Sequence, residues 1–279
     1  MRGSMTGLLW LGTVLTTEGC AGSPVRLVGR DGAILVDSTF SLASFGELHL
    51  VRSGSRDAPL AIFVSGDGGW DGTADRLARE IAHRGFAVVG VDMEQLRNRV
   101  EAQAPLCADL ATLFAVLAKA AHARFKLSAA LPVLVGHSAG ATAVFVALAQ
   151  SRRRVFAGAV SLSFARELEF PVPPCQVAAL RLGPAVEPAL HELVPPVRRL
   201  HAPWSVILGD ADDVIAPNDS RRFVEAVPGT HVWWVAGAGH GLDDSDATEH
   251  ALDEALRTMS ARDDRSHTSN VPMGRFPEC

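Results

Sequence analysis

Residues 134–141 read LVGHSAGA, so a short apolar run ends in Gly136-His137-Ser138-Ala139-Gly140. This pentapeptide matches Gly-x-Ser-x-Gly, a pattern in which the serine occupies a sharp turn between a strand and a helix. The flanks fit such a turn, because an apolar segment at 131–135 precedes it and an Ala-rich segment follows it as far as Gln150. A plain Gly/Ser turn is the alternative interpretation. The rest of the chain decides whether Ser138 has the partners that a nucleophile needs.

Short apolar segments with β-branched residues recur along the chain, at 60–64, 87–91, 131–135, 156–162, 204–208 and 232–235. Strands that are apolar throughout are typical of sheets covered on both faces. Helical periodicity appears between them, most clearly at 71–84 and at 106–121. The alternation of strands and helices predicts an α/β fold with a mainly parallel sheet and helices on both faces.

One main domain, spanning 25–261, is predicted for the chain of 279 residues, because no Pro-, Gly- or Ser-rich linker divides the series of strands. A Pro-rich segment at 165–200 interrupts the alternation, and we interpret it as an excursion over the site. The polar residues 262–279 lack periodicity, which predicts a loose tail.

The first residues, 1–21, have the pattern of a signal peptide: one Arg, an apolar run at 8–15 and a stretch of small residues. The apolar run is too short for a membrane span. Cys20 stands where bacterial lipoproteins carry their lipidated cysteine, and cleavage after Ala21 is the alternative. The pattern favours export to the periplasm or cell envelope; a disordered start of a cytoplasmic protein is the alternative.

The composition, 48% hydrophobic and 20% charged, is that of a globular protein with a full core. A net charge of −5 indicates no nucleic-acid partner, and Arg152-Arg153-Arg154 is interpreted as a solvated helix end. The four cysteines, Cys20, Cys107, Cys175 and Cys279, show no C-x-x-C spacing, so no zinc site is indicated. In an exported protein Cys107 and Cys175 are candidates for pairing. No metal or organic cofactor is expected.

A histidine and several aspartates follow Ser138 in the order Ser, Asp, His, which is that of α/β-hydrolases. A serine hydroxyl needs a base, and His240 lies between glycines after the segment 232–235. Asp212, three residues after Gly209, is the predicted acid that orients this histidine. Asp213 is the alternative acid, and Asp210 is expected to hydrogen-bond within the turn.

The hexapeptide Ser65-Gly66-Asp67-Gly68-Gly69-Trp70 follows the segment 60–64, where this fold supplies one N–H of an oxyanion hole. The backbone N–H groups of Asp67 and Ala139 are the predicted donors. The side chains of Asp67 and Trp70 are predicted to contact the substrate, since a carboxylate beside an oxyanion is tolerable only if it turns away or faces a cation. A phosphate-binding loop is disfavoured, because no Gly-Lys-Ser/Thr follows.

The hexapeptide, Gly85-Phe86-Ala87-Val88-Val89-Gly90-Val91-Asp92, Ala108-Asp109-Leu110 and the Gly-x-Ser-x-Gly turn together resemble the bacterial virulence protein family AcvB/VirJ over about residues 60–245. At the turn, His137 and Ala139 stand where that family usually has Tyr and Phe. The resemblance implies an exported α/β-hydrolase that cleaves aminoacylated phosphatidylglycerol, notably lysyl-phosphatidylglycerol.

The residues therefore predict a serine esterase with the triad Ser138, Asp212 and His240, acting on a lipid or small ester at the membrane surface. A generic esterase or lipase with another acyl group is the first alternative. A non-catalytic envelope protein that binds a partner, such as part of a secretion machine, is the second. An intact triad argues against the second alternative, because a scaffold needs none of these groups. The oligomeric state stays open.

Overall fold

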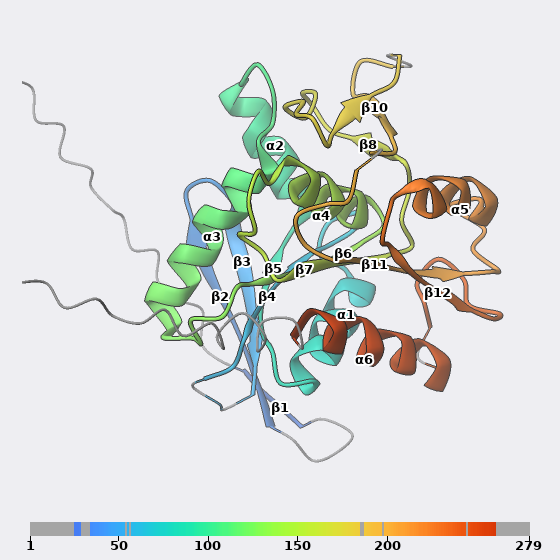
Figure 1. Ribbon diagram of the computed structural model, residues 1–279. Coiled ribbons are helices and arrows are strands. Elements are labelled where there is room, and N and C mark those ends of the chain that lie inside the picture. Colours follow the sequence, from blue (N-terminus) through green and yellow to red (C-terminus); the bar gives the residue numbers. More distant parts are fainter. Residues whose placement is uncertain are drawn as a thin grey trace, which may run out of the picture.

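The computed structural model describes residues 25–28, 34–53, 55, 57–184, 187–196, 198–243 and 245–260. The predicted signal segment 1–21 with Cys20, and the predicted tail 262–279, lie outside the described residues. Among the described residues, nine strands form one sheet in the order β1-β2-β3-β5-β4-β6-β7-β11-β12 (Figure 1). These are β1 (Val25–Val28), β2 (Ile34–Leu42), β3 (Gly46–Arg52), β4 (Leu60–Val64), β5 (Ala87–Val91), β6 (Val133–His137), β7 (Gly158–Leu162), β11 (Trp204–Gly209) and β12 (His231–Val235).

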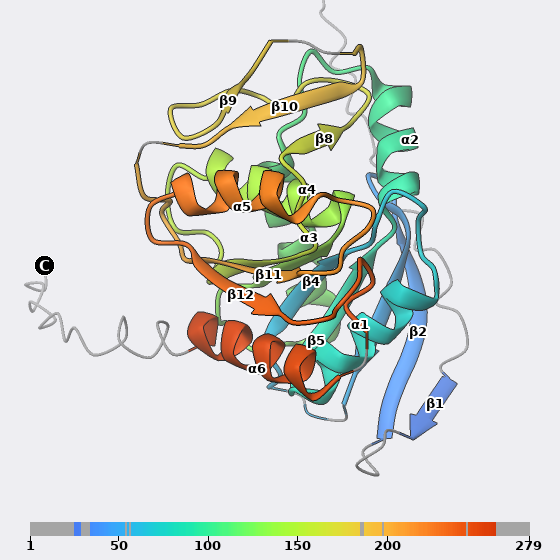
Figure 2. The ribbon, with the colours of Figure 1, turned by 90° about the vertical axis from the view of Figure 1, so that its right-hand side faces the viewer.

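The sheet is mainly parallel, as predicted: β1, β2, β3 and β5 pair antiparallel in turn, and from β5 to β12 each strand is parallel to its neighbour. Helices cover both faces (Figures 1 and 2). One face carries α1 (Gly72–His83) and α6 (Asp246–Ser260); the other carries α2 (Met93–Gln103), α3 (Leu110–Phe125), α4 (Ala139–Gln150) and α5 (Pro217–Ala226). No helix in the described part of the chain is both long and apolar enough to cross a membrane.

Strand β4 shows why the central strands are apolar throughout. All of its residues are buried. Leu60, Ile62 and Val64 pack into the core beneath α3 and α4, whereas Ala61 and Phe63 pack against α1 on the opposite face. Because successive side chains of a strand point to opposite faces, two covered faces require an uninterrupted apolar run.

Capping residues set where the predicted helices begin. The Asp71 carboxylate accepts from Ala74 N at 2.8 Å, so α1 begins at Gly72 inside the predicted range. The helix predicted at 106–121 begins and ends four residues later in the structure, because α3 runs from Leu110 to Phe125. Asp109 caps it by accepting from Thr112 N at 3.0 Å, and the preceding backbone pairs with another segment instead of entering the helix.

The Pro-rich segment forms a small sheet of its own, in the order β8-β10-β9. Its strands are β8 (Glu167–Glu169), β9 (Arg181–Leu182) and β10 (Leu190–Val194). The small sheet lies beyond α4 from the main sheet and next to α2 (Figure 2). Arg97 of α2 and Glu169 of β8 join the two by an ion pair of 2.6 Å. The segment starts beside the first turn of α4, where the Thr142 hydroxyl donates to Ala165 O at 2.7 Å. That it covers the site stays a prediction.

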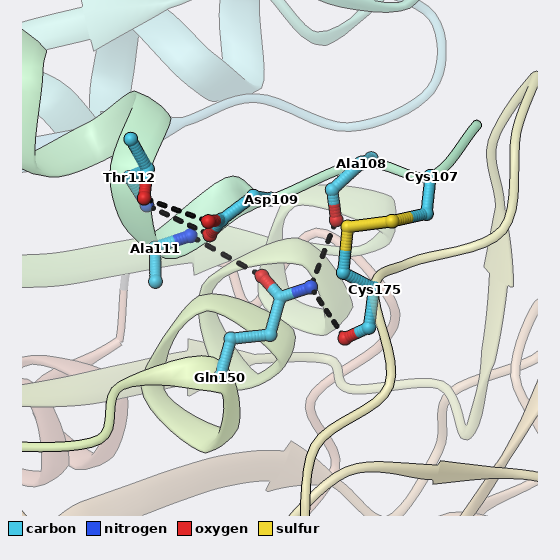
Figure 3. The surroundings of a disulfide bond; sticks show 7 residues. All are labelled: Cys107, Ala108, Asp109, Ala111, Thr112, Gln150 and Cys175. Carbon is cyan, nitrogen blue, oxygen red and sulfur yellow. Dashed lines mark hydrogen bonds between the residues drawn. A yellow bond between two sulfur atoms is a disulfide. The ribbon is translucent and has the colours of Figure 1, made fainter. Parts of the chain in front are cut away.

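A disulfide joins Cys107 and Cys175, the two cysteines proposed from the sequence as candidates (Figure 3). The backbone is paired at the same point, with Cys175 N donating to Ala108 O at 2.9 Å. The buried Gln150 amide also holds both segments, because its Nε2 donates to Ala108 O at 2.8 Å and to Cys175 O at 3.0 Å. These hydrogen bonds involve backbone and amide atoms, not the two sulfurs, so they hold the two segments together in addition to the disulfide.

Removing the disulfide is therefore expected to lower stability without changing the fold. The bridge closes a sequence separation of 68 residues, and a native disulfide of this kind contributes about 2–4 kcal/mol, largely by restricting the unfolded chain. We expect the double variant Cys107→Ser/Cys175→Ser to lose about that amount of unfolding free energy in urea titrations. A reductant should have the same effect on the wild type and none on the variant. An unchanged midpoint in the variant would contradict this expectation.

Candidate active site

The turn at Ser138 has the geometry that its small neighbours predict. Ser138 lies at φ 54° and ψ −122°, directly after β6 and before α4. A Cβ on Gly136 would lie 2.2 Å from Gly140 O, and a Cβ on Gly140 would lie 2.2 Å from Val64 O. Only glycine fits at both positions, because contacts this short are repulsive. The tight turn lifts the Ser138 side chain off the carboxyl end of β6.

Side chains from three separate loops meet at this edge of the sheet. Ser138 Oγ lies 3.0 Å from His240 Nε2, and His240 Nδ1 lies 3.0 Å from Asp212 Oδ2. The Asp212 side chain is 4% exposed and that of His240 is 18% exposed, so the carboxylate is shielded while the imidazole reaches the surface. A chain of serine, imidazole and shielded carboxylate can activate a hydroxyl, with the imidazole as base.

Three aspartates, Asp210, Asp212 and Asp213, lie in the loop after β11, here called the acid loop, and each has a different environment. Asp212 faces His240, and its Oδ1 also accepts from Val214 N and Ile215 N, both at 2.9 Å. Asp210 accepts from Gly237 N at 2.6 Å, so its side chain bonds to the loop after β12 and not, as the sequence had suggested, within its own turn. Asp213 is exposed. His240 is therefore paired with the carboxylate predicted first, and the alternative Asp213 is not brought to it.

The loop that carries His240 is held by side chains that sequence reasoning missed. His137 Nε2 and Ser163 Oγ lie 2.9 and 2.7 Å from the His240 carbonyl oxygen. Arg76 of α1 donates to Gly241 O at 2.6 Å and to Leu242 O at 3.0 Å. All of these contacts join residues far apart in the chain. The only sequence signal was that His137 is an ionisable residue within the Gly-x-Ser-x-Gly turn.

The predicted oxyanion donors lie on two sides of Ser138. Ala139 is the first residue of α4, and the first N–H groups of a helix have no acceptor within it. Across from it, a Cβ on Gly66 would lie 3.5 Å from Ser138 Cβ, so the loop after β4 passes beside the nucleophile. Asp67 follows Gly66, and its side chain is exposed. The two predicted N–H donors thus belong to segments that meet at Ser138.

The Trp70 side chain packs outside the group formed by Ser138, His240 and Asp212. Its ring stacks on His49 at a centroid distance of 3.9 Å and meets Phe63 edge-on at 5.8 Å. The Trp70 ring lies over Gly90, where no larger residue fits, because a Cβ on Gly90 would lie 2.2 Å from Trp70 Cη2. Trp70 lines a hollow of about 510 Å³ with His49 and Asp71, whose lining includes neither Ser138 nor His240. This packing accounts for Trp70 without a substrate.

A mainly parallel sheet, helices on both faces and a Ser-His-Asp network at the carboxyl edge define a protein with the α/β-hydrolase fold. Solved structures agree: Est1E from Butyrivibrio proteoclasticus is 15% identical with a TM-score of 0.54, covering 85% of this chain and 99% of its own. A putative dienelactone hydrolase from Klebsiella pneumoniae subsp. pneumoniae is 16% identical with a TM-score of 0.54, covering 86% of this chain and 98% of its own. At these identities the likeness shows the fold.

The chain belongs to the VirJ family, because residues 58–248 match the family model described as "Bacterial virulence protein (VirJ)". The resemblance predicted from the hexapeptide and the serine turn is thereby confirmed. Among curated proteins, none matches the sequence significantly.

Proposed function

We propose that the protein is a serine esterase whose nucleophile is Ser138. The observation that carries this proposal is the continuous hydrogen-bonded chain from Ser138 Oγ through His240 to the shielded Asp212 carboxylate. A neutral imidazole that donates Nδ1–H to a carboxylate presents a lone pair at Nε2. That lone pair faces the Ser138 hydroxyl at 3.0 Å and can accept its proton.

The reaction follows from this geometry. Ser138 Oγ bonds to the ester carbonyl carbon while His240 Nε2 takes the hydroxyl proton. The carbonyl oxygen becomes an oxyanion, which the N–H groups of Ala139 and Asp67 stabilise. Collapse of the intermediate breaks the ester C–O bond, and His240 returns the proton to the departing alcohol. Water, deprotonated by His240, then adds to the acyl carbon. The bond between that carbon and Ser138 Oγ breaks, Oγ takes the proton back from His240, and the carboxylic acid is released.

For the substrate we propose an aminoacyl ester, with lysyl-phosphatidylglycerol as the candidate implied by the family resemblance. The electrostatics of the loop after β4 support a cationic acyl group. Asp67, Asp71 and Glu94 are all exposed, and Glu94 Oε2 lies 3.3 Å from the position of a Cβ on Gly69. An aminoacyl ester carries an ammonium one carbon from the scissile carbonyl, and in this proposal that ammonium pairs with the Asp67 carboxylate, which follows the residue beside Ser138.

Replacing Asp67 is expected to change substrate preference selectively. An exposed ion pair contributes about 0.2–1 kcal/mol, so Asp67→Asn should lower kcat/KM for lysyl-phosphatidylglycerol by up to about fivefold. Hydrolysis of a neutral acyl ester should be unchanged. Glu101→Gln, which removes the same charge from an exposed position near the end of α2, is the matched control and should leave the ratio of the two rates unchanged. Equal losses on both substrates would make Asp67 a brace for its own loop.

We further propose that the enzyme works in the periplasm or cell envelope. The disulfide between Cys107 and Cys175 supports this location, because stable disulfides form mainly in oxidising compartments. Labelling of the purified protein with an active-site phosphonate tests the serine chemistry before any substrate is known. A protein that neither reacts with the phosphonate nor hydrolyses an ester would return the proposal to a non-catalytic envelope protein.

A further inference from the structure

The backbone carbonyl of His240 receives hydrogen bonds from two side chains at the ends of different strands. His137, the last residue of β6, approaches it with Nε2 at 2.9 Å. Ser163, which directly follows β7, approaches it with Oγ at 2.7 Å. The nucleophile Ser138 follows His137 in the chain. The backbone of the proposed base is therefore tied to the strand that carries the nucleophile, separately from the bond between the two side chains.

The contact between His137 Nε2 and the His240 carbonyl oxygen determines which nitrogen of His137 carries a proton. A carbonyl oxygen only accepts, so His137 Nε2 must donate. Burial lowers the pKa of His137, which favours the neutral ring with Nδ1 unprotonated. Nδ1 faces the loop after β4, because a Cβ on Gly66 would lie 3.7 Å from it. The His137 ring thus fills the space between the loop of the base and the loop beside the nucleophile.

The position of Ser163 indicates a second constraint on the same atom. Ser163 is fully buried and lies at φ 51°, a left-handed conformation that costs a residue other than glycine about 1–2 kcal/mol. Its N–H donates to Ile207 O of β11 at 3.0 Å. The backbone is thereby held in a conformation that directs the hydroxyl to the His240 carbonyl.

Around His240 the backbone is held by a turn, in which Leu242 N donates to Gly239 O at 3.1 Å. His240 lies between Gly239 and Gly241, after the end of β12, where no ladder of a sheet restrains it. Arg76 holds the two carbonyls that follow. A displacement of about 1 Å in a catalytic group can cost about 10²-fold in rate. The two side-chain donors to the His240 carbonyl add a restraint on the residue itself against such a displacement.

We propose that His137 and Ser163 are positioning residues, which hold the His240 carbonyl so that its imidazole lies between Ser138 and Asp212. This inference rests on the proposed function of His240 as base. It assigns a purpose to a histidine at the first variable position of the Gly-x-Ser-x-Gly turn, where the family resemblance indicates tyrosine. His137 acts through His240 and has no contact with the reacting atoms in this role.

Three variants test the proposal with p-nitrophenyl acetate as the probe substrate. His137→Phe keeps a buried ring without the donor, Ser163→Ala removes the second donor, and His137→Gln restores an N–H at a similar reach. We expect about a 10- to 100-fold loss of kcat in the first two, with little change in KM, and recovery in the third. The double variant His137→Phe/Ser163→Ala should lose less than the product of the single losses, because both donors restrain one atom.

A readout independent of turnover separates positioning from a purely structural role. The low-field NMR resonance of the proton between His240 Nδ1 and Asp212 should broaden in His137→Phe and Ser163→Ala and return in His137→Gln. Variants with lowered Tm but wild-type kcat and an unchanged resonance would overturn the proposal. If His137→Phe fails to fold, Ser163→Ala and His137→Gln carry the test. A wild type that neither turns over an ester nor reacts with an active-site phosphonate would refute the proposed function, while the resonance would still decide the positioning.

Discussion

Ser138→Ala is expected to lower kcat for any ester substrate by about 10⁶-fold, to the level supported by binding and the oxyanion donors alone. In the described part of the chain, the Ser138 hydroxyl is the nucleophile that lies against His240 Nε2, at 3.0 Å. His240→Ala should cost about as much, since it leaves the hydroxyl without a base. The double variant should be scarcely slower than either single variant, because the groups act as a unit. Single-turnover and steady-state kinetics with p-nitrophenyl acetate measure all three losses.

Stability provides the control for this experiment. Ser138 is an N-cap residue whose side chain makes no cap hydrogen bond, so its replacement should leave Tm nearly unchanged. Ser205→Ala is the matched substitution, because Ser205 is fully buried in β11 and its Oγ has no hydrogen-bond partner among the described residues. That variant should retain wild-type rates. Wild-type hydrolysis by purified Ser138→Ala would refute the mechanism.

The sequence predicted the parts of the fold that are buried on both faces. Strands β4 and β5 match the predicted segments 60–64 and 87–91, because a continuous apolar run leaves few alternatives. The first three strands were missed. In β3, GELHLVR, buried and more exposed residues alternate at its start, so the strand carries the weaker signal of a half-covered sheet. Helix α2 was also missed, because only Met93, Leu96 and Val100 of its residues are buried.

The arrangement of the candidate site was predictable for a topological reason. Ser138, the acid loop and the His240 loop each follow a parallel strand, and the carboxyl ends of parallel strands meet at one edge of a sheet. The contacts of individual side chains were not predictable in this way. The ring of Trp70 fits over Gly90 in a neighbouring strand, a fact that local sequence does not contain. For Trp70 a role in substrate binding stays a prediction.

Asp212→Asn is expected to produce the second large loss, about 10⁴-fold in kcat, although the change is nearly isosteric. The reason lies in the backbone of the acid loop. Val214 N and Ile215 N both donate to Asp212 Oδ1, whereas Oδ2 is the oxygen nearer to His240 Nδ1, at 3.0 Å against 3.2 Å for Oδ1. An asparagine must turn its carbonyl oxygen toward the two N–H donors, because its amide nitrogen cannot accept from them. Its NH₂ group then points at His240.

This orientation reverses the tautomer of the imidazole. An NH₂ donor opposite Nδ1 makes that nitrogen the acceptor, so the proton of neutral His240 moves to Nε2. Nε2–H cannot take the proton of the Ser138 hydroxyl, and the imidazolium formed later in the reaction also loses its counter-charge. Binding should be little affected, because Asp212 is shielded from the surface. The loss should therefore appear in kcat with KM nearly unchanged.

Asp213→Asn and Asp210→Asn are the matched controls, since they remove the same charge from neighbouring positions of one loop. Asp213 is exposed, so its variant should retain near wild-type turnover. An asparagine at position 210 can still accept from Gly237 N through its own carbonyl oxygen, so that variant should lose little. Steady-state kinetics of the three variants on p-nitrophenyl acetate decide the assignment. The opposite result would be a small loss in Asp212→Asn and a large loss in Asp213→Asn. It would mean that the acid loop rearranges when substrate binds. The carboxylate that faces His240 in the free protein would then not be the one that supports the reaction.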